Sequence, residues 1–189
     1  MKNNIGTFII ESGVARISDP CYEDDPCYED DRCSGVLKNV KKGTWSAVVL
    51  YIDSCGKRVS KLIVSHNDFI ERNRYKYEKF HVGVDSGQAG VFDNNYYRDD
   101  SSVSHMTDKD RMYNEQICKD EPWYSWCCDR TLSKYGAGVI PFGAVSSSGY
   151  GDGVYSCCTH KNDDNEIDSI KIIFIGDEES SDYKYEDRE

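Results

Sequence analysis

The sequence of 189 residues has no run of apolar residues approaching the roughly 20 that a membrane-spanning helix needs. Its start, from Met1 to Ile5, also lacks the long apolar stretch of a secretory signal. We therefore expect a protein that lies outside the membrane, with a cytoplasmic location.

Positive charge is scarce as well. The 23 Lys and Arg residues against 34 Asp and Glu give a net charge of −11. Because a negative surface repels nucleic-acid phosphates, we expect no nucleic acid as a partner, whereas a basic protein or a small polar ligand is compatible with this charge. The residues from Asp177 to Glu189 include seven acids and two bases. This composition predicts a flexible acidic tail over 177–189 after a single domain over 1–176.

Several common site motifs are missing. No Cys-x-x-Cys occurs, which argues against a structural zinc site. No glycine-rich stretch matches a phosphate-binding Gly-x-Gly-x-x-Gly or Walker loop ahead of a helix, and the spacing of Asp85 and Asp93 does not match an EF-hand. Nucleotide-phosphate loops and EF-hands are thus excluded as motifs.

The nine cysteines are the first feature present in excess. Such a number is typical of disulfide-rich secreted proteins, and it leaves secretion open. The odd count and the missing signal favour mostly reduced cysteines that serve as small buried hydrophobes. In a strand, Cys157 and Cys158 would point to opposite faces. A nucleophilic pair of Cys128 with His160 or His81 is an alternative that requires spatial proximity.

Strand patterns dominate the chain. Residues Thr44 to Ile52 and Arg58 to Ser65 are rich in β-branched and aromatic residues around a turn, and predict a hairpin. The apolar stretch from Asp168 to Ile175 predicts a central strand covered on both faces. Further strands are predicted at Phe8 to Glu11, Val14 to Ile17, Lys79 to Val84, Gly90 to Asp93, Val139 to Ser146 and Val154 to His160. The fold class is therefore mostly β, as a β-sandwich or strongly bent antiparallel sheet with one short helix.

The one predicted helix lies between Asp120 and Ser133, where an acid, then Pro122, precede Trp123 and Trp126 on one side. The segment from Asn94 to Lys119 predicts a long loop with one helical turn near Met112 to Ile117. Near the start, Asp19 to Asp24 is repeated without change as Asp25 to Asp30, which we interpret as a local duplication that lengthens an exposed loop.

The main candidate site consists of two glycine-rich loops, each of which leads into a strand, and the two loop–strand segments have similar sequences. Ser86-Gly87-Gln88 precedes Gly90-Val91-Phe92, and Ser148-Gly149-Tyr150 precedes Gly153-Val154-Tyr155. Glycine permits close backbone approach, and the neighbouring aspartates supply oxygen ligands. The ligand-binding candidates are Asp85, Ser86, Gly87, Gln88, Asp93, Ser148, Gly149, Tyr150, Gly151 and Asp152. The alternative interpretation is that these are tight turns whose side chains cap their own backbone.

Four segments together resemble a bacterial family catalogued as domain of unknown function 4241. They are Ser18-Asp19-Pro20-Cys21-Tyr22, the stretch from Val82 to Gly90, Trp123-Tyr124 followed by Cys127-Cys128, and the stretch from Val145 to Gly153. The resemblance runs in order over about residues 12 to 175. It implies a single mostly-β domain with the glycine loops as a shared site, and it implies no established activity.

Three functions follow as hypotheses. The first is binding of a small polar ligand, or of Ca²⁺ or Mg²⁺ through Asp85, Asp93 and Asp152. The second is a hydrolase, metal-assisted or not, that uses Asp85, Asp152 and His81. The third is an interaction protein, such as an immunity or counter-defence factor, that covers a basic partner. We expect the two glycine loops to lie side by side if either site hypothesis holds.

Overall fold

The computed structural model describes residues 1–23, 34–71, 73–113, 118 and 120–176. These residues form the strands β1 (Lys2–Ile10), β2 (Val14–Ser18), β3 (Gly35–Lys38), β4 (Gly43–Asp53), β5 (Lys57–His66), β6 (Lys76–Val84), β7 (Gln88–Asp93), β8 (Ala137–Ile140), β9 (Gly143–Ser147), β10 (Gly153–Lys161) and β11 (Ile167–Ile173). One α-helix, α1 (Pro122–Thr131), and three 3-10 turns, η1 (Asn94–Tyr96), η2 (Asp100–Val103) and η3 (Asp108–Asp110), complete the described elements. The second copy of the hexapeptide repeat and the acidic tail fall outside the described residues.

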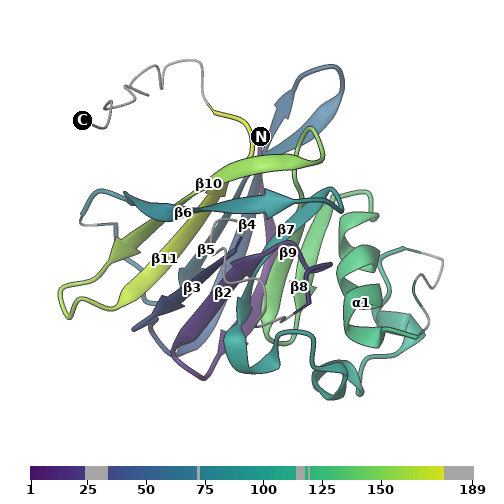
Figure 1. Cartoon of the computed structure of the whole chain (residues 1–189), viewed down its shortest axis with the longest axis horizontal. Coiled ribbons are helices and arrows are strands. Elements are labelled where there is room, and N and C mark those ends of the chain that lie inside the picture. Colours follow the sequence, from purple (N-terminus) through teal and green to yellow (C-terminus); the bar gives the residue numbers. More distant parts are fainter. Residues whose placement is uncertain (24–33, 72, 114–117, 119, 177–189) are drawn as a thin grey trace.

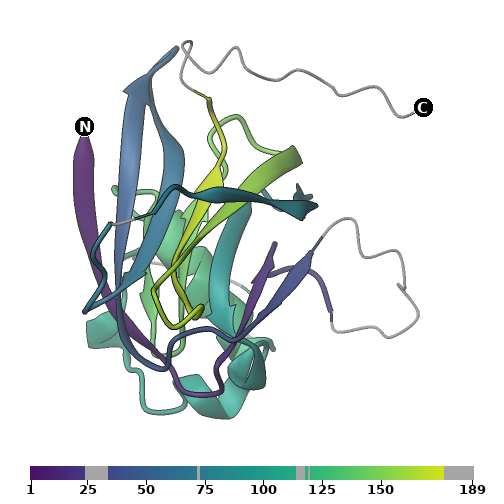
Figure 2. The ribbon, with the colours of Figure 1, turned by 90° about the vertical axis from the view of Figure 1, so that its left-hand side faces the viewer.

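The strands form two antiparallel sheets. The first sheet has six strands in the order β1-β4-β5-β11-β10-β6, and the second has five in the order β3-β2-β7-β9-β8. Figure 2 shows β1 along the outer edge of the first sheet, beside the hairpin of β4 and β5. The predicted mostly-β class is confirmed, since this arrangement is sandwich-like.

The main core lies between the two sheets. It combines residues such as Trp45, Leu62 and Ile170 from the first sheet with Ile17 and Val91 from the second. These side chains are at most 2% exposed, and they alternate with more exposed residues along β4. As predicted, β11 is a central strand, between β5 and β10.

A smaller apolar cluster joins α1 to the other face of the second sheet. Trp123, Trp126 and Cys127 of the helix pack with Phe92 and Val145. Figure 1 shows the helix at the outside of β8, so the layers run from first sheet to second sheet to helix. The predicted helix is confirmed, with Pro122 at its first position.

The predictions for single elements need two corrections. The predicted strand from Val139 to Ser146 is two strands, β8 and β9, which pair with each other around Pro141 and Phe142. Strand β3 has only four residues and was not predicted. The loop after β7 contains three short 3-10 turns, and most of the predicted turn from Met112 to Ile117 falls outside the described residues.

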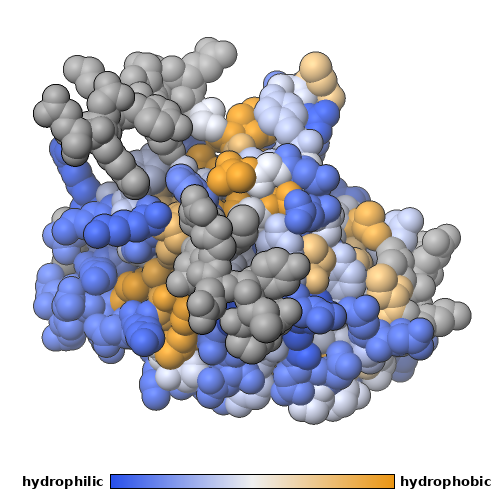
Figure 3. Space-filling view, viewed as in Figure 1, coloured by the Kyte–Doolittle hydropathy of each residue, from blue (hydrophilic) through white to orange (hydrophobic). Residues whose placement is uncertain are grey.

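The surface in the view of Figure 1 is mostly hydrophilic, with apolar side chains gathered in limited areas (Figure 3). Among the described residues, no helix is long and apolar enough to cross a membrane.

Candidate functional site

The two glycine loops lie side by side, as expected. The first, Asp85–Gly87, connects β6 of the first sheet to β7 of the second, and the second, residues 148–152, connects β9 back to β10. Strands β6 and β10 pair up to Val84 and Gly153, and the Ser148 backbone N–H donates to the Gly87 carbonyl (3.0 Å). The two loops therefore connect the sheets at the same place, next to each other.

The strand pairing also determines where Asp85 and Asp152 lie. They are the next residues beyond the Val84–Gly153 pair, one on each chain segment. Residues that face each other across an antiparallel ladder have Cα atoms about 4.5 to 5.5 Å apart, so the register brings the two positions close. Both residues are exposed, and Asp85 Oδ2 accepts a hydrogen bond from the Tyr22 hydroxyl (2.9 Å).

Two glycines leave the backbone of this region uncovered. Gly87 and Gly151 have φ angles of +71° and +103°, and no atom lies within 4 Å of the position a Cβ would occupy. Gly149 differs, because a Cβ there would meet the Val59 carbonyl oxygen at 2.8 Å. The two open glycines allow a ligand to approach the main chain, whereas Gly149 serves close packing.

The first loop is held by a buried carboxylate that the sequence hypotheses did not include among the site residues. Asp19 is 0% exposed. Its Oδ2 accepts from the backbone N–H groups of Asp85 (2.9 Å) and Ser86 (2.7 Å). Its Oδ1 accepts from the Ser86 hydroxyl (2.6 Å) and the Cys21 backbone N–H (2.9 Å). Asp19 therefore organises the loop and has no accepting capacity left for a ligand.

The second loop is held largely by its own side chains. The hydroxyls of Ser148 and Tyr155 both donate to the Gly151 carbonyl, at 2.7 and 2.6 Å. Arg58 donates to the Gly149 carbonyl (3.0 Å) and lies 5.0 Å from the centre of the Tyr150 ring, which is 59% exposed. Ser148 thus has the capping role of the alternative interpretation, and Tyr150 presents an aromatic surface.

Gln88 faces away from the loops toward α1. It is buried, its Nε2 lies 3.4 Å from the Tyr124 hydroxyl and 3.5 Å from Cys128 Sγ, and its Oε1 accepts from the Thr131 hydroxyl (3.1 Å). Its amide therefore joins the start of β7 to the helix.

The thiols near this contact are not activated. Burial raises the pKa of Cys128, and burial together with the Asp19 carboxylate raises the pKa of Cys21 to about 12. Thiols with raised pKa values are protonated near neutral pH and are weak nucleophiles. The environment of Cys128 therefore does not favour nucleophilic catalysis.

Asp93 is separated from the other predicted site residues. It lies at the far end of β7, and a strand of six residues extends about 17 to 20 Å. Its carboxylate accepts from the backbone N–H groups of Glu11 (2.6 Å), Ser12 (2.9 Å) and Asn95 (3.0 Å), so it caps two turns. The structure therefore does not unite Asp85, Asp93 and Asp152, because a whole strand intervenes.

The predicted base, His81, is also apart from the two exposed aspartates. It is exposed on β6, opposite Ser156, four residues before Asp85, which is about 13 Å along a strand. Within the described ranges, no group of three or more His, Cys, Asp and Glu residues is arranged to hold a metal ion.

The second predicted base, His160, is committed elsewhere. Its Nδ1 lies 2.6 Å from Asp168 Oδ1, and its Nε2 accepts from the Asn73 backbone N–H (3.1 Å). Since a backbone N–H can only donate, the Nδ1 atom holds the proton and donates it to Asp168. Both ring nitrogens are used, so His160 is not a partner for Cys128.

The cysteines follow the sequence prediction in part. The seven in the described residues are free: Cys127, Cys128, Cys157 and Cys158 are buried, Cys21 is partly exposed, and Cys55 and Cys118 are exposed. Cys157 is part of the main core, while Cys158 lies on the opposite face of β10.

No family model, curated protein or solved structure matches this chain. The resemblance to the family of unknown function therefore stays a prediction. Its four segments nevertheless include residues that contact one another, since Asp19 binds Ser86, Gln88 contacts Tyr124 and Cys128, and Ser148 binds Gly87.

Proposed function

We propose that this protein binds a small polar ligand at the paired glycine loops, through hydrogen bonds to Asp85 and Asp152. The observation that carries the proposal is the register of β6 and β10, which ends one residue before both aspartates. Two exposed carboxylates at neighbouring positions, beside the open backbone of Gly87 and Gly151, suit a ligand that donates hydrogen bonds. The exposed ring of Tyr150 adds an apolar surface against which such a ligand can lie.

The chemistry of the site favours ligands with hydroxyl or amino groups, such as a sugar or a nucleoside. Carboxylates accept hydrogen bonds and repel anions, and the whole chain carries a net charge of −11. A divalent cation is a less suitable occupant, because Ca²⁺ takes about 6 to 8 oxygen ligands and the aspartate pair supplies few of them. Hydrolysis would require an acid or base within hydrogen-bond reach, and His81 lies about 13 Å along the strand from Asp85.

Thermal unfolding in the presence of defined ligands tests the proposal. We expect at least one of methyl glucoside, galactose, adenosine or uridine, added at millimolar concentration, to raise the melting temperature by a few degrees. The double variant Asp85→Asn, Asp152→Asn removes both charged acceptors. We expect it to lower the apparent affinity, obtained from the melting-temperature shift at increasing ligand concentration, by at least about tenfold. Melting temperatures in CaCl₂ and in MgCl₂ are compared with the melting temperature in EDTA, which tests whether the site binds a divalent cation instead.

A matched control is Asp164→Asn, which changes an exposed aspartate in the turn between β10 and β11. It should leave the ligand-induced shift unchanged. The proposal fails if no probe shifts the melting temperature, or if the double variant responds as strongly as the parent protein.

A further inference from the structure

The outer face of the first sheet, which points away from the second sheet, carries both apolar and basic side chains. Side chains alternate between the two faces of a strand, so the residues between the core positions of β4, β5 and β11 point outward. They are partly exposed, while the residues on either side of each are buried. We call six of them the outer patch: Val48, Leu50, Lys61, Ile63, Lys171 and Ile173.

The register places the side chains of the outer patch next to one another. They form two rows across the strands, with Val48, Ile63 and Lys171 in one and Leu50, Lys61 and Ile173 in the other. Opposite residues of neighbouring antiparallel strands have Cβ atoms about 4.5 to 5.5 Å apart, so each row is continuous. Lys2 of β1, which is exposed and pairs with Leu50, extends the second row.

Among the described residues, no helix packs on the outer patch. Helix α1 lies against the second sheet, on the opposite side of the molecule (Figure 1). Phe69 and Tyr75, between β5 and β6, cover only the neighbouring row, where they pack against His160. The Lys171 ammonium lies 3.8 Å from the centre of the Tyr75 ring, at the border of the patch.

The charges of the outer patch are opposite to that of the whole chain. Its two charged members, Lys61 and Lys171, and the adjacent Lys2 are all basic, whereas the chain has a net charge of −11. The lysines share their rows with Val, Leu and Ile side chains. This combination is complementary to an acidic polypeptide segment that also carries aromatic side chains.

The chain supplies such a segment directly after β11. Residues 177–189 include seven acids and two bases, together with Tyr183 and Tyr185. They begin four positions after Ile173, which is itself in the outer patch. An extended chain reaches about 3.3 Å per residue, so the 13 residues of this segment span about 43 Å, several times the width of about 15 Å of four neighbouring strands. The whole patch is therefore within reach of the segment.

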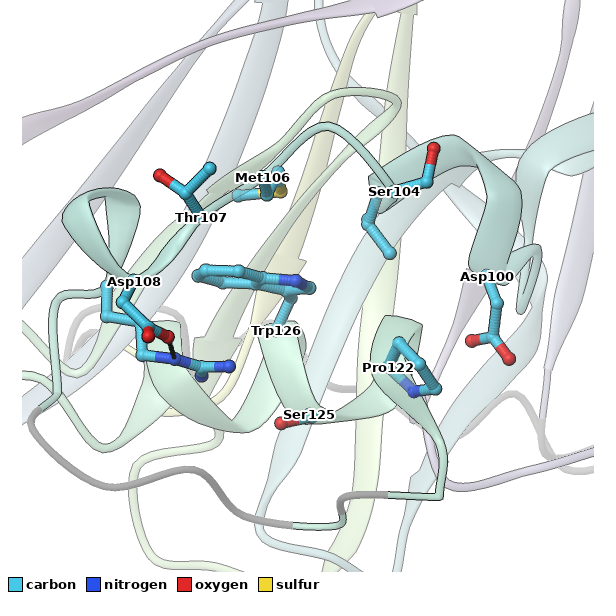
Figure 4. Close-up of a pocket in the computed structure, with 10 residues that line it drawn as sticks. Asp100, Ser104, Met106, Thr107, Asp108, Pro122, Ser125 and Trp126 are labelled. Atoms are coloured by element: carbon cyan, nitrogen blue, oxygen red, sulfur yellow. Dashed lines mark hydrogen bonds and ion pairs between the residues drawn. The ribbon is translucent and has the colours of Figure 1, made fainter.

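Two other open regions of the described surface have the wrong charge for this segment. The glycine loops carry the exposed Asp85 and Asp152. The cavity between α1 and the turns η2 and η3, about 540 Å³ in volume, has the carboxylates of Asp100 and Asp108 on its lining (Figure 4). Like charges at these places repel an acidic segment, so of the three regions the outer patch is the one that attracts it.

Tethering favours this segment over an acidic segment of another protein. Exposed ion pairs contribute about 0 to 1 kcal/mol each, so a separate acidic peptide would gain little against the net charge of the chain. A segment joined to β11 has an effective concentration on the order of millimolar at the patch and has already lost its translational freedom. Weak ion pairs are then sufficient for binding.

We propose that residues 177–189 bind the outer patch of the same chain. Carboxylates of the segment pair with the lysines of the two rows, and the rings of Tyr183 and Tyr185 lie against the apolar side chains between them. Binding of the segment covers a basic and apolar surface that is otherwise open to acidic proteins.

Nuclear magnetic relaxation of the full chain tests this binding. The backbone order parameters of Tyr183 and Tyr185 should exceed about 0.6 at low ionic strength, because lower values mark a flexible chain. In the double variant Lys61→Gln, Lys171→Gln they should fall below about 0.6, because two of the three charges that hold the segment are removed.

The matched control is Lys57→Gln, which changes an exposed lysine of the same strand as Lys61. The Lys57 ammonium lies 3.8 Å from the centre of the ring of Tyr51, a core residue, and thus on the other face of the sheet. This variant should leave the order parameters of the segment unchanged.

Zero-length cross-linking gives a second measurement that needs no variant. A carbodiimide joins a lysine amine to a carboxylate in contact with it, and mass spectrometry identifies the joined peptides. We expect links from Lys61 or Lys171 to residues 177–189 at a yield at least about tenfold above that of Lys57, because binding holds the carboxylates beside the patch. About 0.5 M NaCl should remove this preference, since it screens exposed charge pairs.

Four results would overturn the proposal: order parameters below about 0.6 in the unmodified chain, values that the double variant leaves unchanged, an equal loss in Lys57→Gln, or equal cross-linking of Lys57 and Lys171. A mixture of unlabelled and nitrogen-15-labelled protein shows whether the links join two chains. Links between labelled and unlabelled chains would mean that the segment binds a second copy, which also contradicts binding within one chain.

Discussion

Asp19 shows how one buried carboxylate can fix the position of a loop that is distant in sequence. Each of its two oxygens accepts two hydrogen bonds, three of them from residues 85 and 86, more than sixty positions along the chain. Hydrogen bonds to a charged acceptor contribute more than neutral ones, and four of them offset the cost of removing the carboxylate from water. The residue is therefore a structural requirement of the candidate site.

Asp19→Asn should destabilise the protein by about 3 kcal/mol, because an amide nitrogen in place of either oxygen would face two donors. Urea unfolding measures the change as a lower midpoint at unchanged slope. Asp85→Asn is the control, since Asp85 is exposed and such surface changes stay within about 0.5 kcal/mol. A loss below about 1 kcal/mol for Asp19→Asn would show that the observed hydrogen bonds contribute little.

The glycine loops could be identified from the sequence, but the different roles of the aspartates beside these and other turns could not. Asp19, Asp85 and Asp93 are the same residue type beside turns, yet the first and third are buried caps and the second is exposed. The difference arises from burial by segments far away in sequence, which local composition does not encode.

At the level of elements, glycines with the same backbone angle differ in what surrounds them. Gly87 and Gly149 have φ angles of +71° and +72°, but only Gly149 is packed against backbone. A left-handed conformation costs a residue with a side chain about 1 to 2 kcal/mol. The two loops therefore offer a comparison in which backbone strain is constant and space varies.

Gly87→Ala should cost about 1 kcal/mol, which is the conformational penalty alone. Gly149→Ala should cost about 3 kcal/mol or more, because its Cβ would also overlap the Val59 carbonyl and the Ile175 side chain. Thermal and urea unfolding of the two variants measure the difference. Equal losses would mean that the second loop can shift to accommodate a methyl group.

Most strands were predictable because their periodicity and turns are local. The β4–β5 hairpin combines β-branched residues with a short turn, and both strands form as predicted. The β8–β9 hairpin was missed because its turn, at Pro141 and Phe142, lies inside a stretch that is apolar throughout. The pairing of β6 with β10 joins segments about seventy residues apart. The similar sequences of the two loops suggested that the loops meet, but they could not supply the register, which ends at Val84 and Gly153, one residue before Asp85 and Asp152.

On the scale of the whole molecule, buried thiols and phenols are numerous. Burial raises the pKa values of Cys127 and Cys157 well above 9.0 and that of Cys158 to about 11. Burial also raises the pKa values of Tyr97 and Tyr124. A group whose pKa is higher in the folded state favours folding while it is protonated and opposes folding as pH rises. Each of these groups thus makes the fold sensitive to alkaline pH.

Stability should therefore be constant up to about pH 8 and fall as pH rises past 9, where the thiols of the unfolded chain ionise and the buried ones do not. At pH 10 an unfolded thiol of pKa 9.0 is one unit past its midpoint, which amounts to about 1.4 kcal/mol for each thiol, or about 3 kcal/mol for Cys127 and Cys157 together. Urea unfolding under reducing conditions at pH 8 and pH 10 measures this loss. Cys157→Ala should reduce the pH-dependent part by about 1.4 kcal/mol, whereas replacing the exposed Cys55 should leave it unchanged. Equal stability at the two pH values would mean that the thiols ionise without opposing the fold, and that water reaches them in the folded state.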